Sequence, residues 1–349
     1  MRRAPIPAEL DAVEPLLVSR QAPQVDIGLP TRGEAPYIAE SIDSILAQTH
    51  SAWHLLISEN GPEGSELGER IRPYLADERI EYSPTGSALG AAKNHTRLIQ
   101  HGSAPYIAIL HDDDRWDPEF LERRVEFLES HPDCSFVFSA NREMDERSSE
   151  MRRSRQALAQ GAHPPEELVP LLLRHNLIGM PTVLVRRSAY EAVGPAFDEH
   201  TVYFDYQMWL RLALQFPVGY LAVWDASYRV HDRQVTMTSS RRGLQELTLL
   251  DQIDGLLAEA PHVKPDRRQL RRRRARAHLS AALDQLQAPD RRSVSRHLSD
   301  AVRIYPPAAI DPKMPAALVG LTLGPRGRRA LERLRYLVLR KGLRVHLRR

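Results

Sequence analysis

Short apolar runs alternate with amphipathic segments through residues 24–140. The first run, Val25–Leu29, has the composition of a buried strand, and the apolar positions of residues 38–46 then recur at helical spacing. Further strands are predicted at residues 53–57, 79–83, 106–110 and 134–138, and further helices at residues 89–99 and in a segment ending near residue 130. This alternation is typical of βαβ units, so we expect an α/β fold with a mostly parallel central sheet flanked by helices.

The pattern changes in the second half of the chain. Residues 141–170 are polar with few bulky apolar side chains, and we expect a loop or an exposed helix there. Core character then returns, with a strand near residues 182–185 and a helix near residues 208–212, and helical spacing dominates from residue 241 onward, as in residues 267–286 and 326–345. We therefore predict three parts: an N-terminal extension (1–23), an α/β domain (24–240) and a helical, basic C-terminal region (241–349).

Composition places the chain among folded proteins of a reducing compartment. A chain of 349 residues has room for one large domain and an appendage. The single cysteine, Cys134, has no internal disulfide partner. No secretory signal pattern follows the basic first residues, and no window holds the roughly 20 uninterrupted apolar residues of a membrane span. A cytoplasmic protein is the expectation.

Positive charge is concentrated at the C-terminal end. Residues 326–349 hold ten Arg or Lys against one Glu, whereas the whole chain carries a net charge of +3, so the remainder is net negative. Leucines at helical spacing in residues 326–345 would form an apolar face flanked by arginines, as in helices that lie on anionic membranes. The same face could instead pack on the α/β domain. Any membrane contact is expected to be peripheral.

Three consecutive aspartates, Asp112, Asp113 and Asp114, follow the predicted strand at residues 106–110. Adjacent carboxylates repel one another unless a cation or hydrogen-bond donors compensate, and hard divalent metals prefer oxygen ligands. Aspartate also favours turns and helix starts, so the run alone fits an ordinary loop. Its position at the carboxyl end of a strand, where open α/β sheets bind ligands, favours a metal site that would also take a diphosphate.

Four motifs follow one another along the chain: VDIGLPTR at residues 25–32, SIDSILAQT at residues 41–49, HDDDRW at residues 111–116 and FDYQMWLRL at residues 204–212. Together they resemble the family-2 glycosyltransferases of the GT-A fold, over roughly residues 24–235. The resemblance implies transfer of a sugar from a nucleoside-diphosphate donor to an acceptor hydroxyl by a single displacement with inversion.

The resemblance assigns several residues to the nucleotide. Pro30 and Thr31 form the turn that lies near the base in the family. Glu59 and Asn60 stand where the family usually has two acids that hold the base or ribose, which leaves the choice among UDP-, GDP- and dTDP-sugars open. Lys93 stands where arginine is frequent and would approach the nucleotide, although a solvent-exposed helical lysine is an equal alternative.

A second group of residues is assigned to the metal. His111 occupies a position that is often aspartate; Asp112 aligns with the contact to ribose or diphosphate, and Asp113 with the principal metal ligand. Asp114 is a further candidate ligand, and His231 resembles a late histidine that approaches the metal, with a surface histidine as the alternative. Mg²⁺ or Mn²⁺ would screen the diphosphate and stabilise the charge on the departing nucleotide.

Asp205 matches the family's catalytic base. The base accepts the proton of the acceptor hydroxyl as its oxygen attacks the anomeric carbon, so a carboxylate is needed across the pocket from the nucleotide. The alternative is an aspartate that caps the helix containing Trp209. The acceptor class follows only loosely from the resemblance and covers glycans, lipid-linked acceptors and other hydroxyls, as in bacterial polysaccharide assembly.

Two rival functions use other features of the chain. A GT-A subunit without turnover, which binds or scaffolds, is suggested by the substitutions at Glu59, Asn60, His111 and Phe204, while Asp113 and Asp205 argue against it. A nucleic-acid-binding protein is suggested by Arg271–Arg274 and the basic tail. Because the aspartate run would repel a nucleic-acid backbone, no nucleic-acid partner is expected.

Overall fold

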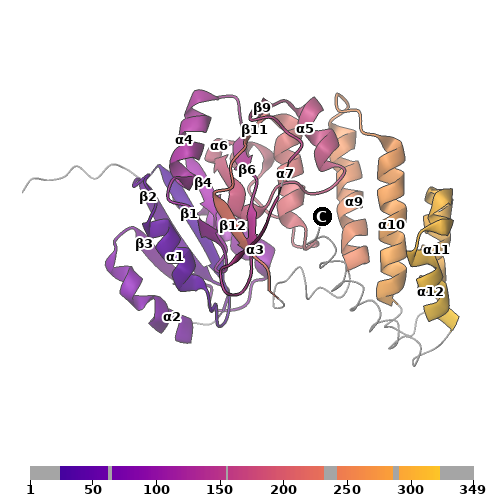
Figure 1. Ribbon diagram of the computed structural model, residues 1–349, viewed down its shortest axis with the longest axis horizontal. Coiled ribbons are helices and arrows are strands. Elements are labelled where there is room, and N and C mark those ends of the chain that lie inside the picture. Colours follow the sequence, from indigo (N-terminus) through magenta and orange to yellow (C-terminus); the bar gives the residue numbers. More distant parts are fainter. Residues whose placement is uncertain (1–23, 62–64, 155, 232–241, 286–290, 323–349) are drawn as a thin grey trace, which may run out of the picture.

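The computed structural model describes residues 24–61, 65–154, 156–231, 242–285 and 291–322. Figure 1 shows a sheet with helices on both faces in one part of the molecule, and a row of long helices beside it formed by the C-terminal part of the chain. The row stands next to α7 (Phe204–Gln215), so the predicted active-site helix lies between the sheet and the row.

The main sheet is mixed with a largely parallel core. Strand order is β3-β2-β1-β4-β10-β6-β11-β9, and the neighbours from β3 to β4 run parallel, as do β6 and β11. Only β10 and β9 run against their neighbours. The strands are β1 (Val25–Thr31), β2 (Trp53–Glu59), β3 (Ile80–Pro84), β4 (Tyr106–Ile109), β6 (Phe136–Ser139), β9 (Gly161–His163), β10 (Val183–Arg186) and β11 (Val218–Leu221). The α/β prediction is confirmed.

Alternate strand residues point to two separate apolar cores. Val25, Ile27 and Leu29 of β1 pack against one set of helices, because successive side chains leave a strand on opposite faces. Ile107 and Ile109 of β4 pack on the other face. The first face is covered by α1 (Ile38–Leu46), α2 (Glu66–Ile71) and α4 (Phe120–Ser130), and the second by α3 (Ala91–Gln100), α5 (Pro165–Leu172), α6 (Arg187–Val193) and α7. Short 3-10 helices lie at Arg72–Ala76, Met180–Thr182 and Pro306–Ile310.

A small second sheet replaces the loop or exposed helix expected for residues 141–170. That prediction was wrong, because the segment forms three short strands and the beginning of α5. Its register depends on pairing with distant strands, which local composition does not encode. Strand order is β5-β12-β7-β8, with β5 (Arg115–Trp116), β7 (Arg142–Met144), β8 (Glu150–Arg153) and β12 (Ala226–Arg229).

The C-terminal helices share the core of the α/β part. Leu249, Leu250 and Ile253 of α9 belong to the same buried cluster as Trp209 of α7, and α10 to α12 add a second small core around Leu279. The helices are α9 (Arg242–Glu259), α10 (Arg267–Gln285), α11 (Arg291–Ile304) and α12 (Lys313–Thr322). The predicted helix at residues 267–286 is thus confirmed.

The helix predicted at residues 326–345 and the extension at residues 1–23 lie outside the described residues. Within the part of the chain that the structure describes, no helix is both long enough and apolar enough to cross a membrane.

Candidate active site

The aspartate run lies at the carboxyl edge of the parallel strands. β1 pairs with β4 up to Gly28 and Ile109, and with β2 up to Thr31 and Glu59, so the ends of the three strands meet at one edge. Thr31, which follows Pro30 at the end of β1, donates its hydroxyl to Asp112 Oδ2 at 2.5 Å. The structure therefore brings together two residues predicted to contact the donor.

Glu59 and Asn60 lie at the same edge but are buried and already hydrogen-bonded. Glu59 Oε2 accepts hydrogen bonds from the Tyr82 hydroxyl and from Ser65 Oγ, the latter at 2.7 Å. Asn60 Oδ1 accepts from the backbone N–H of Leu89 at 2.6 Å. Both side chains thus fix the loops that border the edge.

Lys93 occupies the exposed side of α3. Its ammonium forms an ion pair with Glu199 at 2.8 Å, and each side chain is about half exposed. It lines a shallow cavity with Thr96, Arg97 and neighbouring residues of the same helix. A role for Lys93 at the nucleotide stays a prediction.

Three side chains in and around the aspartate run are spaced to hold a metal ion. His111, Asp113 and Asp114 each offer one ligand atom, and these atoms all lie within 4.8 Å of one another. Asp114 Oδ1 accepts from the backbone N–H of Arg229 at 2.9 Å, but Oδ2 is buried without a hydrogen-bond partner among the described residues. In the part of the chain that the structure describes, the nearest compensating group to Oδ2 is His111 Nδ1, which lies 3.6 Å away as an ion-pair partner. Adjacent buried carboxylates that lack hydrogen-bond donors fit a bound cation.

His231 lies against the predicted principal ligand. Its Nε2 is 2.9 Å from Asp113 Oδ2, and its ring stacks obliquely beside Tyr37 with 5.9 Å between ring centroids. The structure therefore brings His231 to the aspartate run, although the compact trio contains His111 instead.

Arg229 supports the aspartate run from behind. Its side chain is fully buried, and its Nε donates to the backbone oxygen of Asp113 at 2.8 Å. The guanidinium also pairs with Glu40 at 2.9 Å and lies 4.0 Å from the centroid of the Tyr37 ring. Sequence reasoning missed this residue. The sequence did hold a signal for it: Arg229 lies two residues before His231, and in an extended strand residues two apart point to the same side.

A second histidine stands behind His111. Burial lowers the pKa of His111, but Asp114, Asp113 and Asp112 outweigh it and raise that pKa to about 9. His95 Nε2 lies 3.1 Å from His111 Nε2, and burial together with the charge of His111 lowers the pKa of His95 to about 3. The proton therefore belongs to His111, which donates to a neutral His95. His95 was also missed, although helical spacing places it on the buried face of α3 with Ala92 and Leu98.

The carboxylates of the run are difficult to ionise together. Burial and the neighbouring Asp113 together raise the pKa of Asp112 to about 6, and the hydrogen bond from Thr31 partly opposes this shift. Burial and Asp113 likewise raise the pKa of Asp114 to about 6. Like charges held close in a low dielectric have this effect, and a bound cation relieves it.

Asp205 sits in the first turn of α7, within electrostatic range of His111. Its Oδ1 accepts from the adjacent backbone N–H of Tyr206 at 2.7 Å, and the residue at the helix N-cap position is Tyr203. Burial raises the pKa of Asp205 to about 6, and the positive charge of His111 partly opposes this shift. A partly desolvated carboxylate with a pKa just below neutrality is suited to accept a proton.

Curated relatives are similar to about half of the chain. TuaG of Bacillus subtilis, assigned by name to teichuronic acid biosynthesis as a glycosyltransferase, is 27% identical over 169 residues, which are 48% of this chain and 63% of TuaG. WfgD of Escherichia coli, a UDP-Glc:alpha-D-GlcNAc-diphosphoundecaprenol beta-1,3-glucosyltransferase, is 24% identical over 188 residues, or 54% of this chain and 69% of WfgD. The chain thus spans less than two thirds of TuaG.

Solved structures share the fold. The crystal structure of residues 1–349 of S. aureus TarS with UDP-GlcNAc superposes with a TM-score of 0.60 at 11% identity, covering 91% of this chain and 92% of that one. The mannosyltransferase PcManGT of Pyrobaculum calidifontis, solved with GDP-Man and Mn²⁺, gives a TM-score of 0.53 at 16% identity, covering 87% of each chain. The fold is therefore GT-A. Residues 26–194, just under half of the chain, match the family model of glycosyl transferase family 2, so the chain is similar to that family over this part.

Proposed function

We propose that the protein transfers a sugar from a nucleoside-diphosphate donor to an acceptor hydroxyl, with inversion and with the help of Mg²⁺ or Mn²⁺. One observation carries the proposal most directly. The trio of His111, Asp113 and Asp114 offers three ligand atoms within 4.8 Å of one another, at the sheet edge in the part of the chain that matches glycosyl transferase family 2.

The donor would lie along the carboxyl edge of the sheet. Pro30, Thr31, Glu59 and Asn60 border the end of β1 and β2 and would contact the base and ribose, and Asp112 would contact the ribose or diphosphate. UDP-, GDP- and dTDP-sugars remain the candidate donors. TarS and PcManGT, solved with UDP-GlcNAc and GDP-Man, support a nucleotide sugar in a fold of this type.

Asp113 and Asp114 would hold the metal together with His231 or His111. The metal supplies Lewis-acid stabilisation of the diphosphate charge. Arg229 keeps the backbone of Asp113 in place through the hydrogen bond from its Nε at 2.8 Å. The Mn²⁺ present with PcManGT supports a divalent ion without fixing which one this chain uses.

Asp205 would be the general base. Its position in the first turn of α7, within electrostatic range of His111, supports this role. With a pKa of about 6 it is largely ionised at neutral pH and ready to take the acceptor proton.

The acceptor would be a glycan or a lipid-linked hydroxyl. WfgD acts, by its name, on a diphosphoundecaprenol-linked sugar, which supports the lipid-linked class. In this arrangement residues 24–240 form the catalytic domain, and the basic residues 326–349 of the C-terminal region would contact an anionic membrane surface peripherally.

A donor screen tests the proposal. Purified full-length protein is offered UDP-, GDP- and dTDP-sugars with Mg²⁺, with Mn²⁺ and with a chelator, and binding and donor hydrolysis are measured. We expect one nucleotide class to bind with metal only. No metal-dependent binding of any nucleotide sugar would refute the proposal.

Two variants separate the roles of the carboxylates. Asp113→Asn should lose metal-dependent donor binding, whereas Asp205→Asn should keep binding and lose transfer. Asp251→Asn, whose side chain is 71% exposed on α9, is the matched control and should match the wild type. Unchanged transfer in Asp205→Asn would eliminate Asp205 as the base.

A further inference from the structure

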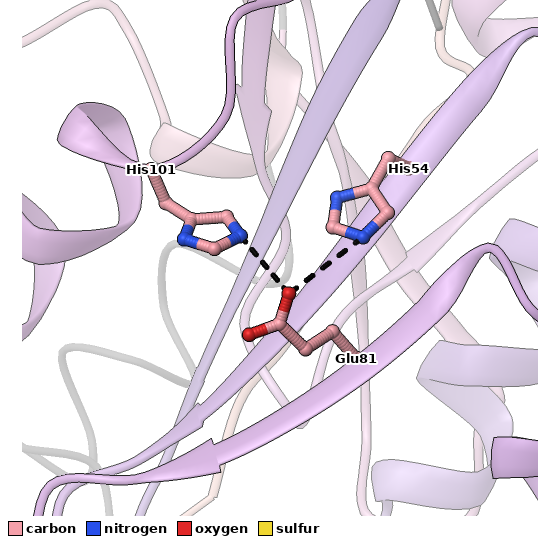
Figure 2. Close-up of side chains that lie close together, drawn as sticks. All are labelled: His54, Glu81 and His101. Carbon is pink, nitrogen blue, oxygen red and sulfur yellow. Dashed lines mark ion pairs between the residues drawn. The ribbon is translucent and has the colours of Figure 1, made fainter.

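A second cluster of residues that could bind a metal lies near the amino ends of β2 and β3, away from the aspartate run. His54 is on β2, Glu81 is on β3, and His101 directly follows α3. Figure 2 shows both imidazoles turned towards one oxygen of Glu81. Glu81 Oε2 lies 3.2 Å from His101 Nε2 and 3.9 Å from His54 Nε2, and the three ligand atoms all lie within 4.8 Å of one another.

The strand register explains why these residues meet. Leu56 of β2 is opposite Glu81 of β3, and His54 lies two residues before Leu56, so His54 and Glu81 share a face. The helix α3 crosses that face, because a Cβ on Gly28 of β1 would come within 2.9 Å of Leu98. His101 follows the end of this helix and so arrives above the same strands.

The ligand set is suited to a borderline divalent metal such as Zn²⁺. Two imidazoles and one carboxylate are zinc ligands, and two ligands each about 2.1 Å from a tetrahedral zinc lie about 3.4 Å apart. The two pairs at 3.2 and 3.9 Å bracket that spacing. Small side-chain rotations would complete the geometry and leave a fourth position for water.

The surroundings of the cluster orient one ligand and leave the site accessible. His54 Nδ1 lies 3.9 Å from Oδ1 of the buried Asp26, so the ring turns its Nε2 to Glu81. Asp26 is itself fixed by Arg187 at 2.5 Å and by the backbone N–H of Ala104 at 2.8 Å. A carboxylate behind a histidine is the usual outer support of a metal ligand. The side chains are 26% (His54), 45% (Glu81) and 34% (His101) exposed, which leaves room for an ion to enter from solvent.

We propose that His54, Glu81 and His101 bind a divalent transition metal of the zinc class, separately from the active site. The aspartate run follows the carboxyl end of β4, whereas His54 and Glu81 lie near the amino ends of β2 and β3. The ion joins the end of α3 to two strands and so stabilises the half of the sheet that positions Thr31 and Glu59. The inference does not depend on the proposed function.

Zinc titration of untagged full-length protein tests the site. Asp113→Asn serves as the background, so that the proposed active-site metal does not contribute. Zn²⁺ affinity is measured by competition with a chromogenic chelator, Co²⁺ is followed by its visible absorption in a tetrahedral site, and thermal unfolding is recorded with and without Zn²⁺. We expect one Zn²⁺ per chain and a higher Tm with the metal.

Removal of one metal ligand should weaken Zn²⁺ binding at least as much as removal of a residue that only orients a ligand. In that background, His101→Ala and the isosteric Glu81→Gln should each lower Zn²⁺ affinity by at least about 100-fold and abolish the Co²⁺ absorption. His262→Ala, an exposed histidine outside both clusters, is the matched control. Equal Zn²⁺ affinity in Glu81→Gln and its parent would overturn the proposal, and so would an equal loss in His262→Ala. If His101→Ala fails to fold, Glu81→Gln decides.

Discussion

Asp205 combines two demands on one carboxylate. Burial raises its pKa to about 6, which makes the ionised form expensive to hold in the folded protein. The same burial brings its basicity close to that needed for proton acceptance at neutral pH. The proposed role as base and the stability of the fold therefore make opposite demands on this residue.

The pH dependence of transfer should report this carboxylate. As the proposed base, Asp205 accepts a proton only when it is ionised, so kcat/KM should fall about tenfold per pH unit below about pH 6. The measurement is kcat/KM from pH 5 to pH 8 with saturating metal in non-chelating buffers. A rate that stays constant down to pH 5 would show that another group, or none, acts as base.

Asp205→Asn should stabilise the protein at neutral pH. The folded pKa of about 6 exceeds the unfolded value, so the folded state loses stability as pH rises from about 4 to 6, and the whole cost is present above pH 6. Asparagine keeps the acceptor for the N–H of Tyr206 without the charge. Urea unfolding at pH 7.5 should show a gain of about 1 to 2 kcal/mol, since one pKa unit corresponds to about 1.4 kcal/mol and the side chain keeps partial solvent contact.

A second measurement at pH 4.5 provides the control. There the wild-type carboxyl is mostly protonated in the folded state, so the advantage of asparagine should shrink. An advantage of equal size at both pH values would mean that charge burial is not its cause.

At the residue scale, the sequence predicts candidate catalytic and metal-binding residues better than it predicts the residues that hold them in place. Asp112, Asp113 and Asp205 stand in motifs whose letters can be compared directly. His95 and Arg229 carry no such motif, and their importance comes from contacts with the aspartate run made 16 residues away, from His95 to His111, and 116 residues away, from Arg229 to Asp113. Periodicity indicates which face of an element each residue occupies, and the three-dimensional structure then shows which residues it contacts.

The helices α9 and α10 of the C-terminal part pack backbone against backbone at Gly243. A Cβ on Gly243, in the first turn of α9, would overlap the backbone of α10 at Ser280 and Ala281. Its N–H donates to Asp284 at 2.7 Å, which fixes the crossing further. Glycine is therefore required here by the approach of a second backbone.

Gly243→Ala should force the two helices apart. Overpacking of a rigid contact costs about 1 to 3 kcal/mol, to be measured as a drop in unfolding free energy by denaturant titration. Gly255→Ala on the same helix is the control, because a Cβ there meets nothing within 4 Å, and it should instead stabilise by up to about 1 kcal/mol through helix propensity. Similar losses in both variants would refute the packing argument.

A buried ion pair joins α4 to the segment before β12. Arg124 donates to both oxygens of Asp225 at 2.9 Å, and the two side chains are 0% and 2% exposed. Ser139 donates to the same carboxylate at 3.1 Å. The charges of Arg124 and Asp225 therefore compensate each other only while α4 stays packed against the segment before β12.

Asp225→Asn should be among the more damaging single substitutions. It leaves the Arg124 guanidinium buried without a counter-charge, a loss of about 3 to 5 kcal/mol in measured unfolding free energy. Asp300→Asn, at the pair formed with the exposed Arg303, is the comparison and should cost less than about 1 kcal/mol. Comparable costs would mean that burial does not set the energy of the pair.

At the element scale, periodicity predicted the long elements and failed for the short ones. The helices α1 and α10 and the strands β1, β2 and β4 follow local apolar patterns, and their positions agree with expectation. The helix predicted to end near residue 130 is α4, which begins at Phe120 and ends at Ser130, and the Asp117 carboxylate before it pairs with Arg142. Strands of two or three residues, such as β5 and β7, depend on pairing with distant segments: both pair with β12, and β7 also pairs with β8.

The whole molecule has a core that crosses the predicted domain boundary at residue 240. Leu249, Leu250 and Ile253 of α9 fill one cluster with Trp209 and Leu212 of α7. The helix that carries Asp205 therefore packs between the sheet and the C-terminal helices. The catalytic part relies on residues beyond its own predicted end.

Truncation should expose this dependence. A chain ending at residue 240 leaves the α7 core open to water, and we expect aggregation or a Tm at least about 10 °C lower by differential scanning fluorimetry. A chain ending at residue 322 keeps every described helix and should hold its Tm within about 2 °C. Independent folding of residues 24–240 with an unchanged Tm would contradict the shared core.

The place of β10 in the sheet limits when the sheet can assemble during synthesis of the chain. Val183–Arg186 fills the gap between β4 and β6 and runs against both, although both are made earlier along the chain. A nascent chain that has not yet exposed residue 186 thus carries the sheet β3-β2-β1-β4 with an open edge at β4, and β6 without either of its neighbours β10 and β11. Open strand edges of this kind are liable to pair with other chains. The ribosome must release more than half of the protein before its central sheet becomes one continuous surface.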